Sequence, residues 1–213
     1  MRHLIGLLLT FAAVLAADSL RIPVGEFSQS RLAGWETKVF RGETRYDLTE
    51  LDSRTVLRAE SRAAASGLVR KMAVDLEKTP YLHWSWRAEN TLGTPNERQK
   101  AGDDYPARLY VVVSGGLMFW RTRSLNYVFA STMAAGSDWP NAFAGDSVRM
   151  LALRSGTAET GRWHEEKRNV REDLQRYFQE DIRRIDAVAL MTDTDNTGGQ
   201  AVAFYGDIYF SAE

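Results

Sequence analysis

The stretch Met191–Gly199 reads MTDTDNTGG and places two carboxylates, an asparagine and two glycines between apolar runs. Asp193 and Asp195 alternate, and Gly198 supplies a turn residue, which is how a calcium-binding loop begins. An EF-hand also needs a bidentate Glu at its twelfth position, and the twelfth residue counted from Asp193 is Phe204. An EF-hand is therefore excluded, whereas other oxygen-ligand chemistry is not.

Three interpretations of this stretch remain open. Asp, Asn and Gly are common in hairpin turns because they tolerate left-handed backbone angles and bond their own backbone. A calcium site is a second interpretation, with Asp193, Asp195 and the more distant Asp207 as candidate ligands. A loop that faces a ligand is the third, and Asn196 then joins the candidate binding residues.

A second polar group precedes an apolar run in Gly102–Arg108, GDDYPAR. Asp104 and Arg108 share strand parity, whereas adjacent residues such as the two aspartates point to opposite faces. We predict a cluster of Arg87, Asp104 and Arg108 with Asp193 or Asp195. Such a cluster is either a salt-bridge network over a sheet or a site for an acidic or hydroxylated ligand, because Arg forks grip carboxylates.

Several kinds of chemistry are not indicated. The chain has no Cys and only three His, and His83 and His164 show no zinc-ligand spacing. No GxSxG elbow, GxxxxGK[ST] loop or GxGxxG motif occurs. Cys-based chemistry is excluded, and no catalytic residue is assigned.

Aromatic residues are the remaining candidates for contacts with a ligand. Trp84 and Trp86 share the apolar parity of their strand and are predicted to lie in the core. Trp120, Trp139 and Trp163 lie in loop-like surroundings, so we predict Trp120 and Trp139 as ligand platforms, with packing within loops as the alternative.

The elements that must position these residues are mostly strands. Alternation of apolar and polar residues, or enrichment in β-formers, marks the candidate strands. The candidates are residues 38–40, 55–59, 71–77, 82–87, 108–113, 125–130, 148–153, 185–191 and 201–210. One helix is expected over about 170–182, because its apolar residues recur at helical spacing and Asn169 with Glu172 approaches a capping box. The pattern predicts an all-β fold, an antiparallel jelly-roll-like sandwich of eight to eleven strands with this short helix.

The N-terminus predicts export. Arg2 and His3 precede an apolar run from Leu4 to Leu15 and small residues up to Ala17, as in a signal peptide. The run is too short to span a membrane comfortably, so we expect no stable membrane insertion after cleavage of residues 1–17. Residues 18–213 are then expected to form a single periplasmic or secreted domain. The formal net charge of −1 argues against a nucleic-acid binder.

Six ordered blocks carry a family resemblance. They are AAASGL (63–68), LHWSWR (82–87), GDDYPARLYVV (102–112), LNYVFA (125–130), RNV (168–170) and MTDTDNTGGQAVAFYGDIYF (191–210). Together, from about Trp35 to the C-terminus, they resemble the bacterial family of domain of unknown function 3047. The resemblance implies an exported β-sandwich protein and no particular activity. The last block also looks like the closing strands of jelly-roll carbohydrate-binding modules, which is an analogy of fold.

We therefore predict an exported, non-catalytic module that binds a glycan or a related polar ligand, with either no cofactor or calcium. A polysaccharide hydrolase or lyase on the same sandwich is one alternative, using Asp104, Asp193 or Asp195 with Arg87 and Arg108. An envelope protein that binds another protein is the other alternative.

Overall fold

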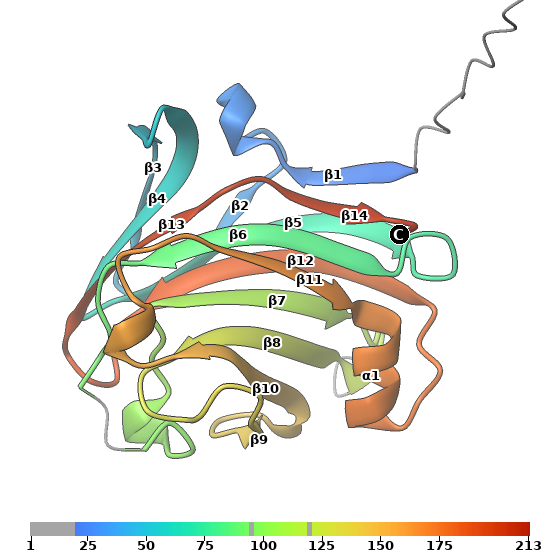
Figure 1. The fold of residues 1–213 in the computed structure, drawn as a ribbon. Helices are drawn as coiled ribbons and strands as arrows, with labels where there is room; N and C mark the ends of the chain where they lie inside the picture. The colour runs from blue at the N-terminus through green and yellow to red at the C-terminus, as the bar shows by residue number, and fades with distance from the viewer. Residues whose placement is uncertain (1–19, 94–95, 119–120) are drawn as a thin grey trace, which may run out of the picture.

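The computed structural model describes residues 20–93, 96–118 and 121–213. The predicted signal peptide, residues 1–17, lies outside them. The described residues form 14 strands in two packed sheets and one α-helix, which lies at one end of the two sheets (Figure 1). The predicted all-β sandwich with a short helix is confirmed.

The first sheet, sheet A, has the strand order β1–β14–β6–β13–β4–β3, and β11 pairs with β6. Its strands are β1 (Arg21–Gly25), β3 (Arg45–Leu51), β4 (Arg54–Arg62), β6 (Tyr81–Ala88), β11 (His164–Asn169), β13 (Gln200–Tyr205) and β14 (Ile208–Ser211).

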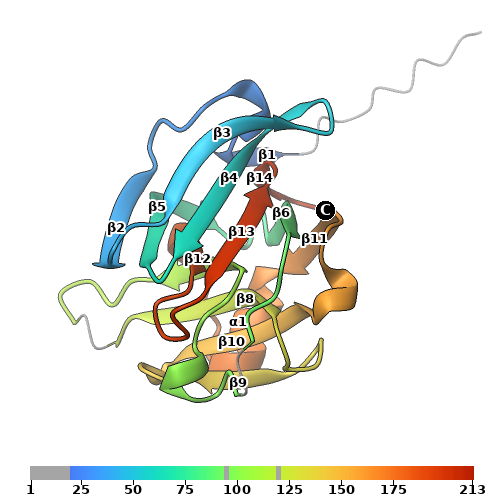
Figure 2. The same cartoon turned by 90° about the vertical axis from the view of Figure 1, so that its left-hand side faces the viewer.

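The second sheet, sheet B, has the order β2–β5–β12–β7–β8–β10–β9, so β2 and β9 form its two edges (Figure 2). Its strands are β2 (Glu36–Arg41), β5 (Ala65–Asp75), β7 (Ala107–Val113), β8 (Arg123–Ala130), β9 (Asp138–Asn141), β10 (Gly145–Ser155) and β12 (Arg184–Asp193). Its pairs are antiparallel except β8 with β10, which run parallel. Residues 131–144, which include β9, make the long return connection that a parallel pair needs.

The core lies between the two sheets, where the central strands bury alternate residues. On β7, Leu109 and Val111 are buried in this core, and Arg108 and Tyr110 lie on the outer face. Trp84 and Trp86 of β6 are buried as predicted. Burial of each large apolar side chain of this kind stabilises the fold by roughly 1.5–3 kcal/mol.

The helix α1 (Val170–Phe178) begins where its cap predicts. The Asn169 side chain accepts a hydrogen bond from the backbone N–H of Glu172, and its Nδ2 donates to Glu172 Oε1, so the two residues cap the helix reciprocally. The helix ends four residues before the predicted Ile182, because Gln179 adopts a left-handed φ of 57°. Ile182 still packs against the core, which explains the helical spacing that the sequence shows.

Four strands were not predicted: β1, β3, β9 and β11. Strand β11 has the sequence HEEKRN, which lacks apolar alternation because its buried positions are filled by partnered polar groups. Glu166, for example, accepts from Trp86 Nε1 at 3.0 Å and from Arg154 Nε at 2.7 Å. The predicted strand 201–210 is in fact β13 and β14, separated by Gly206 and Asp207.

Within the described ranges, no helix combines the length and the apolar character needed to cross a membrane.

Candidate functional site

The outer face of sheet B, which points away from sheet A, is hollowed into a cavity of about 540 Å³. We call this cavity the outer groove. Small residues make the floor deep: Ala65 and Gly67 on β5, and Ala187 and Ala189 on β12. Larger aliphatic and aromatic side chains complete the floor, namely Val69, Tyr110, Val112, Val148 and Met191. The groove therefore crosses the strands rather than following one of them.

Two exposed phenylalanines flank the outer groove. Phe40 on the edge strand β2 is 66% exposed, and Phe143, in the turn between β9 and β10, is 58% exposed. These two positions belong to opposite ends of the strand order of sheet B. Both side chains line the groove together with its apolar floor, and an exposed apolar patch of this kind marks a candidate contact surface.

A charged network closes one end of the groove. Arg108 is only 5% exposed, and its Nε donates to Asp193 Oδ1 at 2.9 Å while a terminal nitrogen donates to the second oxygen. The same nitrogen reaches the backbone oxygen of Asp103 at 3.3 Å. The Asp103 carboxylate in turn accepts from Asn141 Nδ2 at 2.9 Å. This paired arrangement fixes Arg108 at the wall of the groove.

Asp104 explains the conformation of the stretch 193–199. Its buried carboxylate accepts hydrogen bonds from the backbone N–H groups of Asn196 and Thr197 at 3.2 and 2.6 Å. It also accepts from Thr197 Oγ1 at 2.7 Å and from Asn196 Nδ2 at 3.1 Å. Gly198 follows with a φ of 69°, a conformation that favours glycine. The stretch is thus a turn fastened by a carboxylate, with Asp195 and Asn196 at the groove.

Three carboxylates converge beside this turn. Asp104, Asp193 and Asp195 each place one oxygen within 4.8 Å of the others. Hard cations such as calcium take oxygen ligands of this kind. However, Arg108 already bonds both oxygens of Asp193, and the turn occupies the carboxylate of Asp104.

The other candidate residues are placed elsewhere. Asp207, the predicted third metal ligand, lies between β13 and β14 of sheet A, where its carboxylate accepts from the backbone N–H of Ser28 at 2.8 Å. Arg87 also belongs to sheet A and pairs with Glu89 and Asp52, so it does not join the predicted cluster. Both residues are therefore absent from the outer groove.

The predicted aromatic platforms do not line the groove in the part of the chain that the structure describes. Trp139 is 2% exposed and packs with Tyr105 and Met150 in a second apolar cluster, because the 131–141 segment folds over sheet B. Trp120 lies outside the described residues. Trp163 is half-buried and stacks under Arg54 at 3.8 Å, over sheet A. The aromatic side chains that flank the groove are instead those of Phe40 and Phe143.

Burial shifts the pKa of two carboxyls at the groove upward. Desolvation, with the nearby charge of Asp104, raises the pKa of Asp195. Desolvation raises the pKa of Asp103 as well, although Arg108 and Asn141 act in the opposite direction. Ionised Asp195 therefore destabilises the folded state at neutral pH, and this cost fades as the pH falls through its raised pKa.

Asp195→Asn is accordingly expected to raise the melting temperature at pH 7. The gain should vanish below about pH 3.9, the ordinary value for an aspartate, because Asp195 is then protonated in both folded and unfolded chains. Thermal melts from pH 3 to 8 measure the difference. An equal gain at pH 3 and pH 7 would contradict the electrostatic cause, and Asp47→Asn on sheet A serves as a control.

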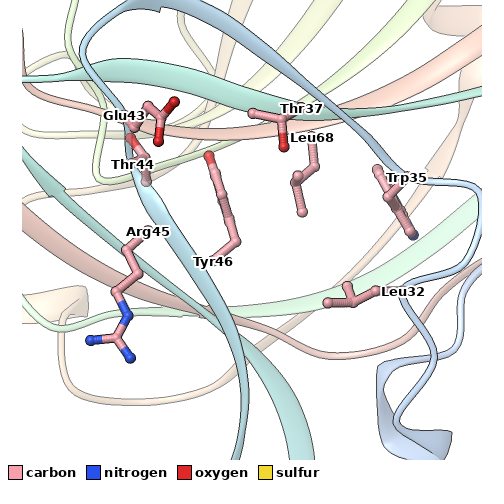
Figure 3. Close-up of a pocket in the computed structure, with 8 residues that line it drawn as sticks. All are labelled: Leu32, Trp35, Thr37, Glu43, Thr44, Arg45, Tyr46 and Leu68. Carbon is pink, nitrogen blue, oxygen red and sulfur yellow. The ribbon is translucent and has the colours of Figure 1, made fainter.

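A second hollow of about 350 Å³ lies between the edge strands β2 and β3 (Figure 3). Trp35, Leu32 and Leu68 form its apolar part, and Arg45 turns its guanidinium away from them. Its central hydroxyl, Tyr46 Oη, already donates to the backbone oxygen of Ser66 at 2.7 Å. This hollow offers less unoccupied polar chemistry than the outer groove.

The comparisons with known proteins settle the family and the fold. Residues 33–209 match the family described as "Protein of unknown function (DUF3047)". The chain belongs to the DUF3047 family. The resemblance to this family that the six sequence blocks indicated is therefore confirmed. No curated protein matches it.

Solved structures similar to this DUF3047 protein include a carbohydrate-binding module and a cellulose-induced protein. One is the family 30 carbohydrate-binding module of a cellulosomal cellulase of Clostridium thermocellum, with a TM-score of 0.51 and 9% identity over 91% of this chain and 98% of that chain. The other is the cellulose-induced protein Cip1, with a TM-score of 0.50 and 8% identity over 88% of this chain and 96% of that one. At such identities the similarity shows a shared β-sandwich fold and does not by itself assign a function.

Several residues of the site were missed by the sequence reasoning. Tyr110 shares the parity of Arg108, so the outward face of its strand signalled it. Asn126 interrupts the apolar strand LNYVFA, which is another readable signal. Phe40, Phe143 and Asn141 carry no such signal, because their positions at the groove depend on how distant strands pair.

Proposed function

We propose that this DUF3047 protein is an exported, non-catalytic module that binds a glycan or a related polar ligand in the outer groove of sheet B. Residues 18–213 would form the exported β-sandwich domain, periplasmic or secreted, after cleavage of the predicted signal peptide. The shared fold with a carbohydrate-binding module is consistent with this proposal.

The main support for this proposal is the mixture of apolar and polar residues that line the outer groove. Binding sites for small molecules are concave and mostly apolar, with a few convergent polar groups that fix orientation. The groove has this composition, since an aliphatic floor meets the polar end formed by Asp103, Arg108, Asp193, Asp195 and Asn196. A sugar has apolar ring faces and hydroxyl edges, so it presents the complementary chemistry to both parts.

Phe40→Ala and Phe143→Ala are expected to weaken glycan binding by about 3–10-fold each, because each removes one aromatic contact with a ring face. Both side chains are exposed, so the melting temperature should stay unchanged within about 1–2 °C. Isothermal titration calorimetry with cellohexaose, xylohexaose, mannohexaose and chitohexaose measures the binding.

Val39→Ala is the matched control, because Val39 neighbours Phe40 on β2 and does not line the groove. If none of these glycans binds the wild-type protein, or if both phenylalanine variants bind as the wild type does, the groove is not a glycan site.

A glycan-cleaving enzyme is the second candidate, and one observation favours it: two carboxyls with raised pKa, Asp103 and Asp195, line the same groove. A raised pKa suits a general acid. Asp103 is already held by Asn141, which supports a structural role for it. Product formation from the same glycans, abolished by Asp195→Asn, would establish the enzyme instead of the binding module.

A further inference from the structure

Tyr110 presents a hydrogen-bond donor on the floor of the outer groove. Its hydroxyl donates to the thioether sulfur of Met191, with 3.3 Å between Oη and Sδ. Among the described residues, no oxygen or nitrogen accepts from this hydroxyl. Burial raises the pKa of Tyr110 to about 12, although Arg108 acts to lower it, so the hydroxyl keeps its proton at neutral pH.

Asn126, on the neighbouring strand β8, also donates a hydrogen bond to a methionine sulfur. It is 1% exposed, and its Oδ1 is occupied by the hydroxyl of Ser124 at 2.7 Å. Its Nδ2 donates to the sulfur of Met150 at 3.4 Å and to no oxygen or nitrogen within the described ranges. The amide oxygen thus has a hydroxyl donor, and the only acceptor that the amide nitrogen meets among the described residues is a thioether.

The two donors are adjacent across the sheet. Tyr110 of β7 and Asn126 of β8 are direct partners in the antiparallel register, and both line the groove. Directly opposed residues have Cβ atoms about 4.5–5.5 Å apart, so one ligand can contact both.

A thioether is a weak acceptor, whereas hydroxyl, ether and carbonyl oxygens are strong ones. A buried donor without a good acceptor keeps most of its desolvation cost. A ligand that brings an oxygen to these donors would relieve that cost.

We infer that Tyr110 and Asn126 are the specificity-determining pair of the outer groove. In the free protein they donate hydrogen bonds to the sulfur atoms of Met191 and Met150, and in the complex they donate to acceptor oxygens of the ligand instead. This inference rests on the proposed glycan-binding function and deepens it. The ligand class follows from the charges that line the groove. Three carboxylates, Asp103, Asp193 and Asp195, face two cations, Lys38 and Arg108, so a neutral hydroxylated glycan is preferred to a uronate.

The first experiment is calorimetric titration of Tyr110→Phe with the four neutral hexasaccharides and with hexagalacturonate. The variant should bind the neutral ligand about 3–10-fold more weakly, the range for one lost hydrogen bond. Tyr209→Phe is the matched control, because Tyr209 lies on β14 of sheet A, stacks on His83 and does not line the groove, so its affinity should equal that of the wild type.

The second variant, Met191→Leu, separates recognition from packing. Removing the sulfur leaves the Tyr110 donor without its acceptor in the free protein, and the bound ligand supplies one. Affinity should therefore rise about 2–5-fold, although a residue with only a packing role would lower it on substitution. Met72→Leu, a similar change on the core side of sheet B, should leave affinity unchanged.

The possible outcomes are distinct. If the wild-type protein binds none of the glycans, the proposed function fails and this inference fails with it. If it binds a neutral glycan but Tyr110→Phe binds equally well, or Met191→Leu binds more weakly, only the inference is overturned. Tighter binding of hexagalacturonate than of any neutral glycan would overturn the predicted ligand class.

Discussion

Arg108→Met is expected to lower the free energy of unfolding by about 3–5 kcal/mol, the usual cost of removing one partner from a buried ion pair. Arg108 and Asp193 are both almost fully buried, so the substitution leaves the Asp193 carboxylate without its cation in a poorly solvated place. Urea denaturation at pH 7 measures the change.

Two control variants make the Arg108 result specific. Arg87→Met removes the same charge from the surface of sheet A, where Arg87 pairs with Glu89 and Asp52, and should cost about 0–1 kcal/mol. The double variant Arg108→Met with Asp193→Leu removes both charges and should recover most of the loss. A cost for Arg108→Met no larger than that of Arg87→Met would show that the pair is not a buried ion pair in solution.

Glu97→Gln is expected to lower the free energy of unfolding by about 2–4 kcal/mol, because charge-assisted hydrogen bonds are lost and buried donors lose their acceptor. Glu97 is fully buried, and its carboxylate accepts from the backbone N–H groups of Ser131, Thr132 and Met133. An amide nitrogen in place of one oxygen would face these donors.

The effect of Glu97→Gln should reach the outer groove. The turn that Glu97 holds begins the segment that leads through β9 to Asn141 and Phe143 at the groove. Hydrogen exchange at residues 131–133 should speed up, and ligand affinity should fall. Glu89→Gln, on a partly exposed salt bridge of sheet A, is the matched control and should cost less than about 1 kcal/mol. Equal stability of the two variants would contradict this role for Glu97.

The local features of this protein are readable in its sequence because their causes are local. Period-two alternation placed Trp84 and Trp86 inside and Arg108 outside, since a strand exposes alternate faces whatever it packs against. Asn169 and Glu172 marked the start of α1, because a cap is made by residues three positions apart. These regularities, with the family blocks, were sufficient for an all-β sandwich with one helix.

Other features depend on which sheet a strand joins, and strand periodicity carries no information about that. Arg87 and Arg108 both point outward from their strands, but β6 belongs to sheet A and β7 to sheet B. Of these two arginines, only Arg108 therefore joins the aspartates of the predicted cluster. Trp139 was predicted as a ligand platform and is buried, because the return connection between the parallel strands β8 and β10 folds over sheet B.

The sequence by itself determined most of the strands, the helix cap and the turn-forming character of residues 193–199. Tertiary structure alone decided that Asp104 fastens this turn, that Phe40 and Phe143 flank one groove, and that Tyr110 lies beside Asn126. The physical reason is distance along the chain: these contacts join residues that are far apart in sequence, and only strand pairing brings them together.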